Sequence, residues 1–560
     1  MREFANKAKT GRFNFVLACL ILANLGIICR LYYIQIVKGE HYKAWAQGLQ
    51  EFSQEPAVER GEIFFRGGEP LAINKNFTFA YASPPNVRDV PSTAKKLAAI
   101  LSLDEKDVLT RLEKETLYSS LKERLSDDEI KGIKEANLDG IYLRERKERF
   151  YPQGFLAAQV VGFMREGSQG QYGIEEYYDE ELSQGKDLTL NLDYNIQYSA
   201  EQLIASAQRD LRTQDAEAVV MDPRNGEVLA MAKTPNFDPN NYKEFANKPE
   251  TVKLFNNDSC QELFEPGSVF KPFTMSSALN EGKVTPDTKY IDNGIVIIGG
   301  YKVLNYGERS YGEQTMTQVL EKSINTGSVF AKNQLGNEAF MKYLEAFGFF
   351  EPTGIDIGET YSSNKEFKKG YDINYATAAF GQGIQITSMQ LMRGYCALAN
   401  GGWLVRPSVV KNEHAPADPS KRRQVISSET SDTIKKMLVS VIENGYSKKA
   451  SIPGYYIAGK TGTAQLTWGF YGIDRKGYSD QTMQSFIGFF PAYDPQFLVL
   501  IKLNAPQAKT AEYSALPIFH ELSRQILYLY QVPPDFDASQ HNGQAGASWN
   551  QTAVSGSSSN

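Results

Sequence analysis

The sequence predicts a multi-domain protein of the α/β (α+β) class with one membrane-spanning helix near its N-terminus. At 560 residues the chain is too long for a single hydrophobic core, so it should divide into two to four folded units. Strand-like and helix-like stretches follow one another through most of the sequence, and one uninterrupted apolar run stands near the N-terminus. These observations define the expected architecture.

The apolar run at residues 13–29 contains no charged side chain, and the segment before it carries four basic residues and one acidic residue. An apolar stretch of roughly 17–25 residues can cross a bilayer as a helix, and a basic flank stays in the cytoplasm. Because Arg30 interrupts the exit and no small-residue cleavage site follows, an uncleaved anchor is favoured over a signal peptide. We therefore expect a cytoplasmic tail at 1–12 and a transmembrane anchor at 13–36 in the plasma membrane, with the remaining chain outside the cytoplasm.

Composition and charge argue against several classes of function. The net charge of −6 gives no basic footprint, so nucleic acid is not an expected partner. The four cysteines and four histidines are scattered, without a C-x-x-C pair or an H-E-x-x-H motif. No metal site, cofactor or disulfide framework is therefore expected, although a single bridge between Cys260 and Cys396 is left open.

The rest of the chain divides by composition into three parts. Residues 37–190 mix candidate strands with charged helical stretches and show no catalytic pattern, which favours a structural or partner-binding module of mixed α+β type, a pedestal. The character changes near Asp193, so a second domain is expected at 191–532. Residues 533–560 are poor in aliphatic side chains and rich in Ser, Gly, Asn and Gln, which predicts a disordered tail.

Strands are expected at both ends of the second domain, with helices between them. A helix with apolar residues at helical spacing comes first, followed by two strands around a Pro-Arg-Asn-Gly turn. Three further strand-like runs precede a closing amphipathic helix. The segments are 194–211, 216–232, 453–465, 483–493, 495–506 and 516–531. This order predicts an α/β sandwich in which strands distant in the chain share one sheet.

Ser268 and Lys271 lie one helical turn apart in the stretch EPGSVFKPFT. Pro272 is harmless only in the first turn of a helix, so the helix should begin near Ser268. The i,i+3 spacing then places Lys271 on the same face as the serine hydroxyl, beside the positive end of the helix. An apolar environment would lower the pKa of the lysine and allow it to act as a general base.

The Ser-x-x-Lys spacing alone carries little weight, because a helix-capping serine with a surface lysine gives the same pattern. It recurs at Ser92, Ser119, Ser183, Ser362 and Ser408. Two further motifs strengthen the reading. Ser323-Ile-Asn325 stands at the front of another predicted helix, and Lys460-Thr461-Gly462-Thr463 ends a β-branched and aromatic run. The three motifs occur in order on one side of the membrane.

This set resembles the S-x-x-K, S-x-N and K-T-G signature of penicillin-binding proteins and serine β-lactamases. The chain is similar to the class B penicillin-binding proteins, the monofunctional peptidoglycan D,D-transpeptidases, over most of residues 10–530. Further similar blocks are ERGEIFFRGGEPLA (59–72), RFYPQGFLAAQVVGF (149–163), YGIEEYYDEEL (172–182), VVMDPRNGEVLAMA (219–232), FGQGIQITSMQLM (380–392) and LANGG (398–402). The septal cell-division and sporulation types are the most similar, and the elongation type comes second.

The resemblance implies a serine β-lactamase-like transpeptidase domain, a mainly antiparallel sheet with helices on both sides, preceded by a pedestal of the dimerisation type. It implies that Ser268 forms an acyl-enzyme on a stem peptide with release of D-alanine, and that Lys271 is its base. Ser323 would relay a proton to the leaving amine, and Asn325 would hold the lysine and the substrate amide.

The K-T-G strand is implied to bind the substrate. Lys460 would attract the terminal carboxylate, assisted by the hydroxyls of Thr461 and Thr463, and Gly462 would leave the strand bare for the substrate backbone. The N–H groups of Ser268 and Thr463 would form the oxyanion hole. The block FGQGIQITSMQLM is expected to pack beneath the site. One departure is Phe65, which stands where the family usually has an aspartate.

The expected function is therefore a membrane-anchored D,D-transpeptidase of septal wall synthesis. Alternatives are an elongation-type transpeptidase, a D,D-carboxypeptidase or β-lactamase that uses water as acceptor, and a non-catalytic β-lactam-binding scaffold. Expected partners are stem peptides ending in D-Ala-D-Ala, β-lactams, a multi-pass membrane glycosyltransferase and other division proteins.

Overall fold

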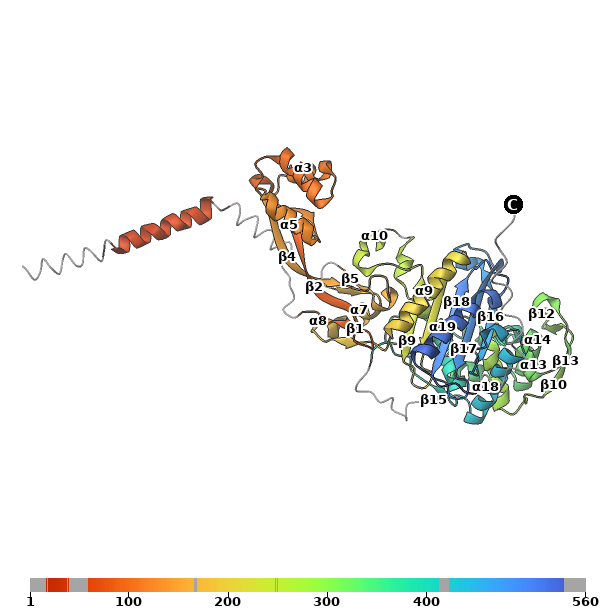
Figure 1. Cartoon of the computed structure of the whole chain (residues 1–560). Helices are drawn as coiled ribbons and strands as arrows, with labels where there is room; N and C mark the ends of the chain where they lie inside the picture. Colours follow the sequence, from red (N-terminus) through yellow and green to blue (C-terminus); the bar gives the residue numbers. More distant parts are fainter. Residues whose placement is uncertain are drawn as a thin grey trace, which may run out of the picture. The chain divides into compact units, whose positions relative to one another are not determined.

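The protein is described here from a computed structural model that covers residues 17, 19–37, 39, 59–165, 169–246, 248, 250–411 and 423–537. The predicted cytoplasmic tail and most of the predicted C-terminal tail lie outside these residues. The chain forms two compact units, and each is described by itself (Figure 1). Unit 1 is Met1–Arg60 with Asn74–Phe150, and unit 2 is Gly61–Ile73 with Tyr151–Asn560. The domain boundaries expected from the sequence stay predictions.

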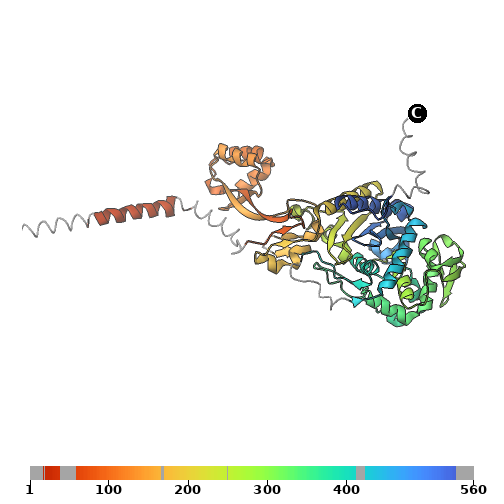
Figure 2. The ribbon, with the colours of Figure 1, turned by 60° about the horizontal axis from the view of Figure 1, so that its bottom comes forward.

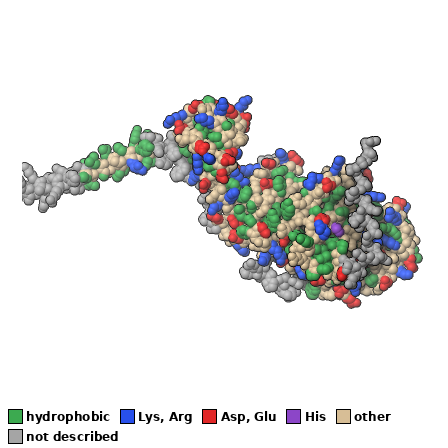
Figure 3. All heavy atoms as spheres, viewed as in Figure 1, with side chains coloured by type: hydrophobic (Ala, Val, Ile, Leu, Met, Phe, Trp, Pro, Cys, Tyr) green, Lys and Arg blue, Asp and Glu red, His purple; other side chains and the backbone are tan. Residues whose placement is uncertain are grey.

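An apolar helix at Cys19–Ile36 has a mean hydropathy of 1.7 and buries none of its residues within the protein. Hydrophobic side chains lie along its surface between patches of other atoms, and a basic side chain stands near one end (Figure 3). Its last turn is a π-helix, η1 (Tyr33–Val37). By length and composition the helix can cross a membrane, as expected for the anchor at 13–36; residues 13–16 and 18 of that prediction lie outside the described residues.

Unit 1 combines a small sheet with three helices. Strand β2 (Pro70–Ala82) pairs with β3 (Ser119–Lys122) and β4 (Ile141–Phe150). The helices are α3 (Val90–Leu101), α4 (Glu105–Leu112) and α5 (Asp127–Ala136). Polar side chains fix where they begin: in α5, Ser126 and Glu129 each accept a hydrogen bond from the other's backbone N–H, a capping box. This is the mixed α+β content that the sequence predicts.

Unit 2 is built on a five-stranded sheet of order β16-β17-β18-β8-β9, in which every neighbouring pair is antiparallel. The strands are β8 (Asp215–Met221), β9 (Val228–Thr234), β16 (Ala458–Thr467), β17 (Tyr478–Phe490) and β18 (Phe497–Asn504). Strands that lie far apart in the sequence are thus neighbours, since β18 pairs with β8, for example Leu498 with Met221. The prediction that chain-distant strands share one sheet is confirmed.

Helices cover both faces of this sheet because its strands alternate between two apolar cores (Figure 2). On one face, α9 (Tyr194–Asp210) and α19 (Ala515–Leu529) pack against residues such as Val220 and Ile501. On the other, α12 (Lys271–Asn280), α17 (Ser388–Ala399) and α18 (Ser428–Glu443) pack against residues such as Val219 and Leu500. The expected layers are confirmed.

Three short helices of unit 2, α6 (Ala158–Val161), α7 (Gly173–Tyr177) and α8 (Asp179–Ser183), precede β8, and further helices lie between β9 and β16 in the chain. They include α13 (Met316–Glu321), α14 (Asn325–Leu335), α15 (Asn337–Ala346) and α16 (Asp372–Ala378). Two small two-stranded sheets accompany them, β10 (Lys289–Asp292) with β13 (Gly312–Thr315) and β11 (Ile295–Ile298) with β12 (Tyr301–Leu304).

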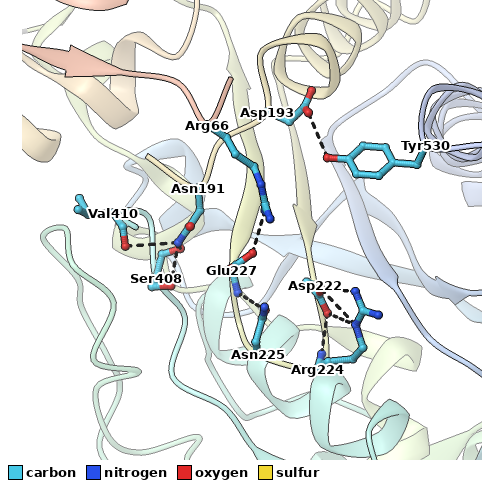
Figure 4. A network of polar contacts seen from close by, with 10 residues as sticks. All are labelled: Arg66, Asn191, Asp193, Asp222, Arg224, Asn225, Glu227, Ser408, Val410 and Tyr530. Carbon is cyan, nitrogen blue, oxygen red and sulfur yellow. Dashed lines mark hydrogen bonds and ion pairs between the residues drawn. The ribbon is translucent and has the colours of Figure 1, made fainter. Parts of the chain in front are cut away.

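Segments from three parts of the chain are joined to the base of the sheet in unit 2. Strand β1 (Ile63–Phe64) runs parallel to β7 (Leu188–Thr189), and Arg66 Nη1 forms an ion pair of 2.8 Å with Glu227 Oε2 (Figure 4). The Asn191 amide donates to the carbonyl oxygens of Ser408 at 3.2 Å and Val410 at 3.3 Å. Residues 61–66 and 188–191 are therefore joined to the sheet and to residues 408–410, and these segments together form the base of unit 2.

Phe65, the departure from the family pattern, is completely buried in this base. Its ring meets the edge of Tyr194 with 5.4 Å between centroids and an interplanar angle of 88°. This geometry matches the quadrupoles of the two rings. An aromatic contact thus occupies the position where an aspartate was expected.

Replacing Phe65 with alanine should lower the free energy of unfolding by about 3–5 kcal/mol, because a buried aromatic ring is lost and a cavity remains. Guanidinium unfolding of the full-length chain in detergent measures this value. Phe155→Ala is the matched control, since that ring is 58% exposed, and it should change the value by less than about 0.5 kcal/mol. Equal effects of the two substitutions would contradict the packing role of Phe65.

Candidate active site

Ser268 lies on a single 3-10 turn, η5 (Gly267–Phe270), which continues directly into α12. Pro272 occupies the first turn of α12, where its missing N–H leaves no hydrogen bond unmade. Gly267 has a φ of 63°, a left-handed conformation that glycine adopts without strain, and it turns the chain into the serine. The prediction that the helix begins near Ser268 is confirmed.

Residues from the three predicted motifs meet at the hydroxyl of Ser323. The Nζ atom of Lys271 donates to the Ser323 carbonyl oxygen at 2.5 Å and to its Oγ at 3.2 Å. The Nζ atom of Lys460 donates to the same Oγ at 3.0 Å. Ser323 itself has a φ of 57°, so its backbone is held in a left-handed conformation that is uncommon for serine. Side chains far apart in the sequence therefore form one hydrogen-bonded cluster.

Burial controls the charge of both lysines. Lys271 has no exposed surface, and burial lowers its pKa well below the usual range; the nearby amine of Lys460 lowers it further. Burial also lowers the pKa of Lys460, to about 7, against the opposing effect of Glu512. Burial therefore favours the uncharged amine of Lys271, and Lys460 is close to the midpoint of its titration near pH 7.

The two serines are more exposed than the two lysines. Ser268 and Ser323 are half-buried, whereas Lys271 and Lys460 are buried. This arrangement suits a nucleophilic hydroxyl supported from behind by a neutral base.

Asn325 departs from its expected role. It begins α14, and its amide donates a hydrogen bond of 2.8 Å to the carbonyl oxygen of Leu304 at the end of β12. That contact ties the helix to a neighbouring strand instead of holding Lys271, which is hydrogen-bonded by Ser323. A contact between Asn325 and a substrate amide stays a prediction.

Strand β16 carries the K-T-G motif at one side of the sheet, and among the described strands it pairs only with β17. Thr461 and Thr463 are half-buried on this strand. A strand with one unpaired side can hydrogen-bond an extended peptide through its backbone. The strand thus offers a surface for a peptide next to the lysine cluster.

Gly462 has a packing role that the sequence did not indicate. A Cβ atom there would stand 2.4 Å from Ser485 Oγ, 2.9 Å from a Val269 methyl group and 3.2 Å from the Pro266 carbonyl oxygen. The missing side chain therefore makes room for the nucleophile turn that carries Ser268. The expectation that the glycine also keeps the strand bare for substrate stays a prediction.

Three hydrogen bonds from distant segments fix the backbone around Ser268. They run from Tyr395 Oη to the Val269 carbonyl oxygen (2.7 Å), from Gly267 N to the Gly381 carbonyl oxygen (2.9 Å) and from Tyr478 Oη to Glu265 Oε2 (2.9 Å). Sequence reasoning missed both tyrosines because no local pattern distinguishes them. Gly381 lies in the FGQG block, which was expected to pack beneath the site.

Two family models match the chain. The penicillin binding protein transpeptidase domain matches residues 216–524, and the penicillin-binding protein dimerisation domain matches residues 55–190. The first match covers more than half of the chain and includes every motif of the cluster.

Known proteins are similar along almost the whole chain. Stage V sporulation protein D of Bacillus subtilis is 32% identical, over 93% of this chain and 86% of that protein. The peptidoglycan D,D-transpeptidase FtsI of Escherichia coli is 28% identical, over 94% of this chain and 92% of that protein. A crystal structure of penicillin binding protein 3 from Mycobacterium tuberculosis, complexed with ampicillin, matches with a TM-score of 0.67 and 26% identity, covering 86% of this chain and 97% of that chain.

The close packing at Gly462 predicts that Gly462→Ala destabilises unit 2 by about 1–3 kcal/mol, because Ser485 and the nucleophile turn must shift to admit a methyl group. Differential scanning calorimetry of the full-length chain in detergent measures the loss. Gly469→Ala in the same hairpin is the control, since its nearest contact would be at 3.7 Å. A stable Gly462→Ala protein would show that the turn has room to spare.

Proposed function

This chain belongs to the family of penicillin-binding protein transpeptidases, and on that premise we propose that it is a class B peptidoglycan D,D-transpeptidase acting through an acyl-enzyme on Ser268. One observation carries the proposal: Lys271 and Lys460 converge on the hydroxyl of Ser323 beside the turn that presents Ser268. The motif order, the fold and the two family models agree with it.

In the first step, neutral Lys271 accepts the proton of Ser268 while the serine oxygen attacks the carbonyl carbon of the penultimate D-alanine. The developing oxyanion accepts hydrogen bonds from the backbone N–H groups of Ser268 and Thr463. Each such donor contributes about 3 kcal/mol in comparable acyl-transfer sites. The lowered pKa of Lys271 supports this role, because a charged amine cannot accept a proton.

In the second step, the C–N bond breaks and the terminal D-alanine leaves as an amine. The Ser323 hydroxyl donates its proton to that amine and takes one from Lys271, to which it is already hydrogen-bonded. Ser268 now carries the acyl group, and Lys271 is again neutral. The amine of a second stem peptide then attacks the acyl-enzyme, which forms the cross-link and restores the serine.

Lys460 provides the positive charge for the substrate's terminal carboxylate, with the hydroxyls of Thr461 and Thr463 as additional donors. The open side of β16 supports this role, since a stem peptide can lie along it as an added strand. β-Lactams present a similar carboxylate beside a reactive carbonyl, so they should acylate Ser268 and remain bound.

The protein is anchored by its N-terminal apolar helix. We place its N-terminus in the cytoplasm and unit 2 outside, where peptidoglycan is assembled, as the basic N-terminal segment predicts. The similarity to a sporulation protein and to FtsI supports a role in septal wall synthesis. A multi-pass membrane glycosyltransferase and other division proteins are the proposed partners.

Incubating the full-length chain with benzylpenicillin should produce a persistent covalent adduct, because the acyl-enzyme lacks an acceptor amine. Intact-protein mass spectrometry detects the adduct, and Ser268→Ala should show none. Ser276→Ala, a buried serine on the same helix, is the control and should still react. Rapid adduct loss with accumulation of penicilloate would instead indicate a hydrolase, and a folded protein without adduct would exclude the serine mechanism.

Acylation should depend on pH in two opposite ways. It requires neutral Lys271, so it weakens at low pH as that amine becomes protonated; it also requires charged Lys460, so it weakens as pH rises through about 7. The second-order rate constant for benzylpenicillin, measured from pH 5 to 10, reports both groups in the free enzyme. Lys460→Arg keeps the charge and should remove the alkaline decline. An unchanged decline in this variant would assign it to another group.

A further inference from the structure

A buried ion pair lies in the sheet beneath the nucleophile segment. Glu217 of β8 and Lys502 of β18 are directly paired in register, with 3.0 Å between Nζ and Oε1, and their side chains are 3% and 2% exposed. The neighbouring residues on the same face, Val219 and Leu500, belong to an apolar core. Two charges in such a place add little net stability compared with an apolar pair of the same volume. Their position calls for another explanation.

Glu217 is joined to two segments that enclose the active site. Its Oε2 accepts a hydrogen bond of 2.7 Å from Ser259 Oγ on α11 (Asp258–Gln261), which precedes the turn η5 that carries Ser268. Its Oε1 accepts a further hydrogen bond from Ser388, the first residue of α17. The Glu217 carboxylate therefore links three elements: β18, helix α11 before the turn that carries Ser268, and the first residue of α17.

Lys502 holds the same entering segment from the other side. Its Nζ forms a second ion pair of 3.0 Å with Glu262 Oε2, and it lies over the ring of Phe264 at 4.4 Å from the centroid. The backbone of Phe264 exchanges two hydrogen bonds of 3.0 Å with Ile386. The amine thus contacts Glu262 and Phe264, two side chains of the segment that leads into the turn carrying Ser268.

The sheet register connects this pair with the K-T-G strand. Lys502 pairs with Ser485, and Ser485 pairs with Gly462, so the three lie in one row across neighbouring strands. The Ser485 side chain is fully buried. Together with Val269 of the nucleophile turn, it borders the space that a side chain at position 462 would need. The row therefore fixes the separation between the ion pair and the strand that faces Ser268.

From these contacts we infer that Glu217 and Lys502 are positioning residues, which hold residues 259–264 and thereby set where Ser268 stands relative to Lys271 and β16. The inference rests on the proposed serine mechanism. The pair touches no substrate, so it should affect the reaction step rather than ligand binding.

Lys502→Met removes the charge and both contacts to the entering segment while keeping an unbranched chain of similar volume. In the full-length protein, the rate constant of acylation by benzylpenicillin should fall at least tenfold, and the dissociation constant of the preceding complex should change less than threefold. Lys502→Arg can still bridge Glu217 and Glu262, and it should stay within threefold of the parent. Rapid-quench mass spectrometry over a range of ligand concentrations separates the two constants.

The double variant Glu217→Gln/Lys502→Met separates positioning from stability. It removes both charges of the buried pair, and Glu262, which loses its partner, has a side chain that is 29% exposed, so the double variant should fold even if Lys502→Met alone does not. Its acylation rate constant should remain at least tenfold low. Lys435→Met is the matched control: this buried lysine of α18 pairs with Asp432 at 2.8 Å, away from the entering segment, and its loss should leave the rate constant within threefold.

Hydrogen exchange gives a second measurement that does not depend on acylation. The backbone amides of residues 264, 265 and 267–270 should exchange at least tenfold faster in the double variant than in the parent, and at the parent rate in Lys435→Met; Pro266 has no amide hydrogen. Normal acylation and normal exchange in the folded double variant would overturn the inference. A parent protein that forms no adduct would overturn the proposed function instead, and exchange at 264–270 would still decide the role of the pair.

Discussion

The hydroxyl of Ser323 lies between two buried amines, and the surrounding structure follows from what that arrangement requires. Two ammonium groups could not both stay charged in an enclosed space, so burial shifts Lys271 to its neutral form and brings Lys460 near its titration midpoint. Burial therefore favours a neutral Lys271, which could accept a proton, and it leaves beside it Lys460, whose pKa is about 7. The left-handed backbone of Ser323 is the local strain that accompanies this geometry.

The sheet of unit 2 supplies the rigidity that such a cluster needs. Its strands carry apolar residues on both faces, so helices from distant parts of the chain are fixed against it and bring Ser268 and Ser323 to the strand of Lys460. Tyr395 and Gly381 then hold the nucleophile turn by its backbone. Helices and strands therefore hold the side chains of the cluster in place before a substrate binds.

Much of this fold was predictable because local patterns report it. The alternation at 216–232 and the runs near the C-terminus indicated strands, and Pro272 located the helix start by Ser268. The placement of Lys271 beside the Ser268 hydroxyl, which the i,i+3 spacing indicates, stays a prediction, because the hydrogen bonds of Lys271 go to Ser323. Contacts between distant parts of the chain could not be predicted, because they form only when strands and helices pack. They are the hydrogen bond of Tyr395 to Val269, the close packing around Gly462 and the hydrogen bond of Asn325 to Leu304. Phe65 was visible as a departure, but its partner Tyr194 was not.

The chain enters unit 2 at Gly61–Ile73, leaves it for residues 74–150 and returns at Tyr151. The excursion starts and ends on the paired strands β2 and β4, where Asn74 Oδ1 accepts a hydrogen bond of 3.4 Å from Arg149 Nη1. Residues 74–150 of unit 1 are therefore an insertion whose two ends meet, the topology in which one module can be exchanged without cutting the fold of its host. Variation in length or surface within residues 74–150 can then accumulate independently of the catalytic cluster, so this inserted module is where related chains are free to diverge.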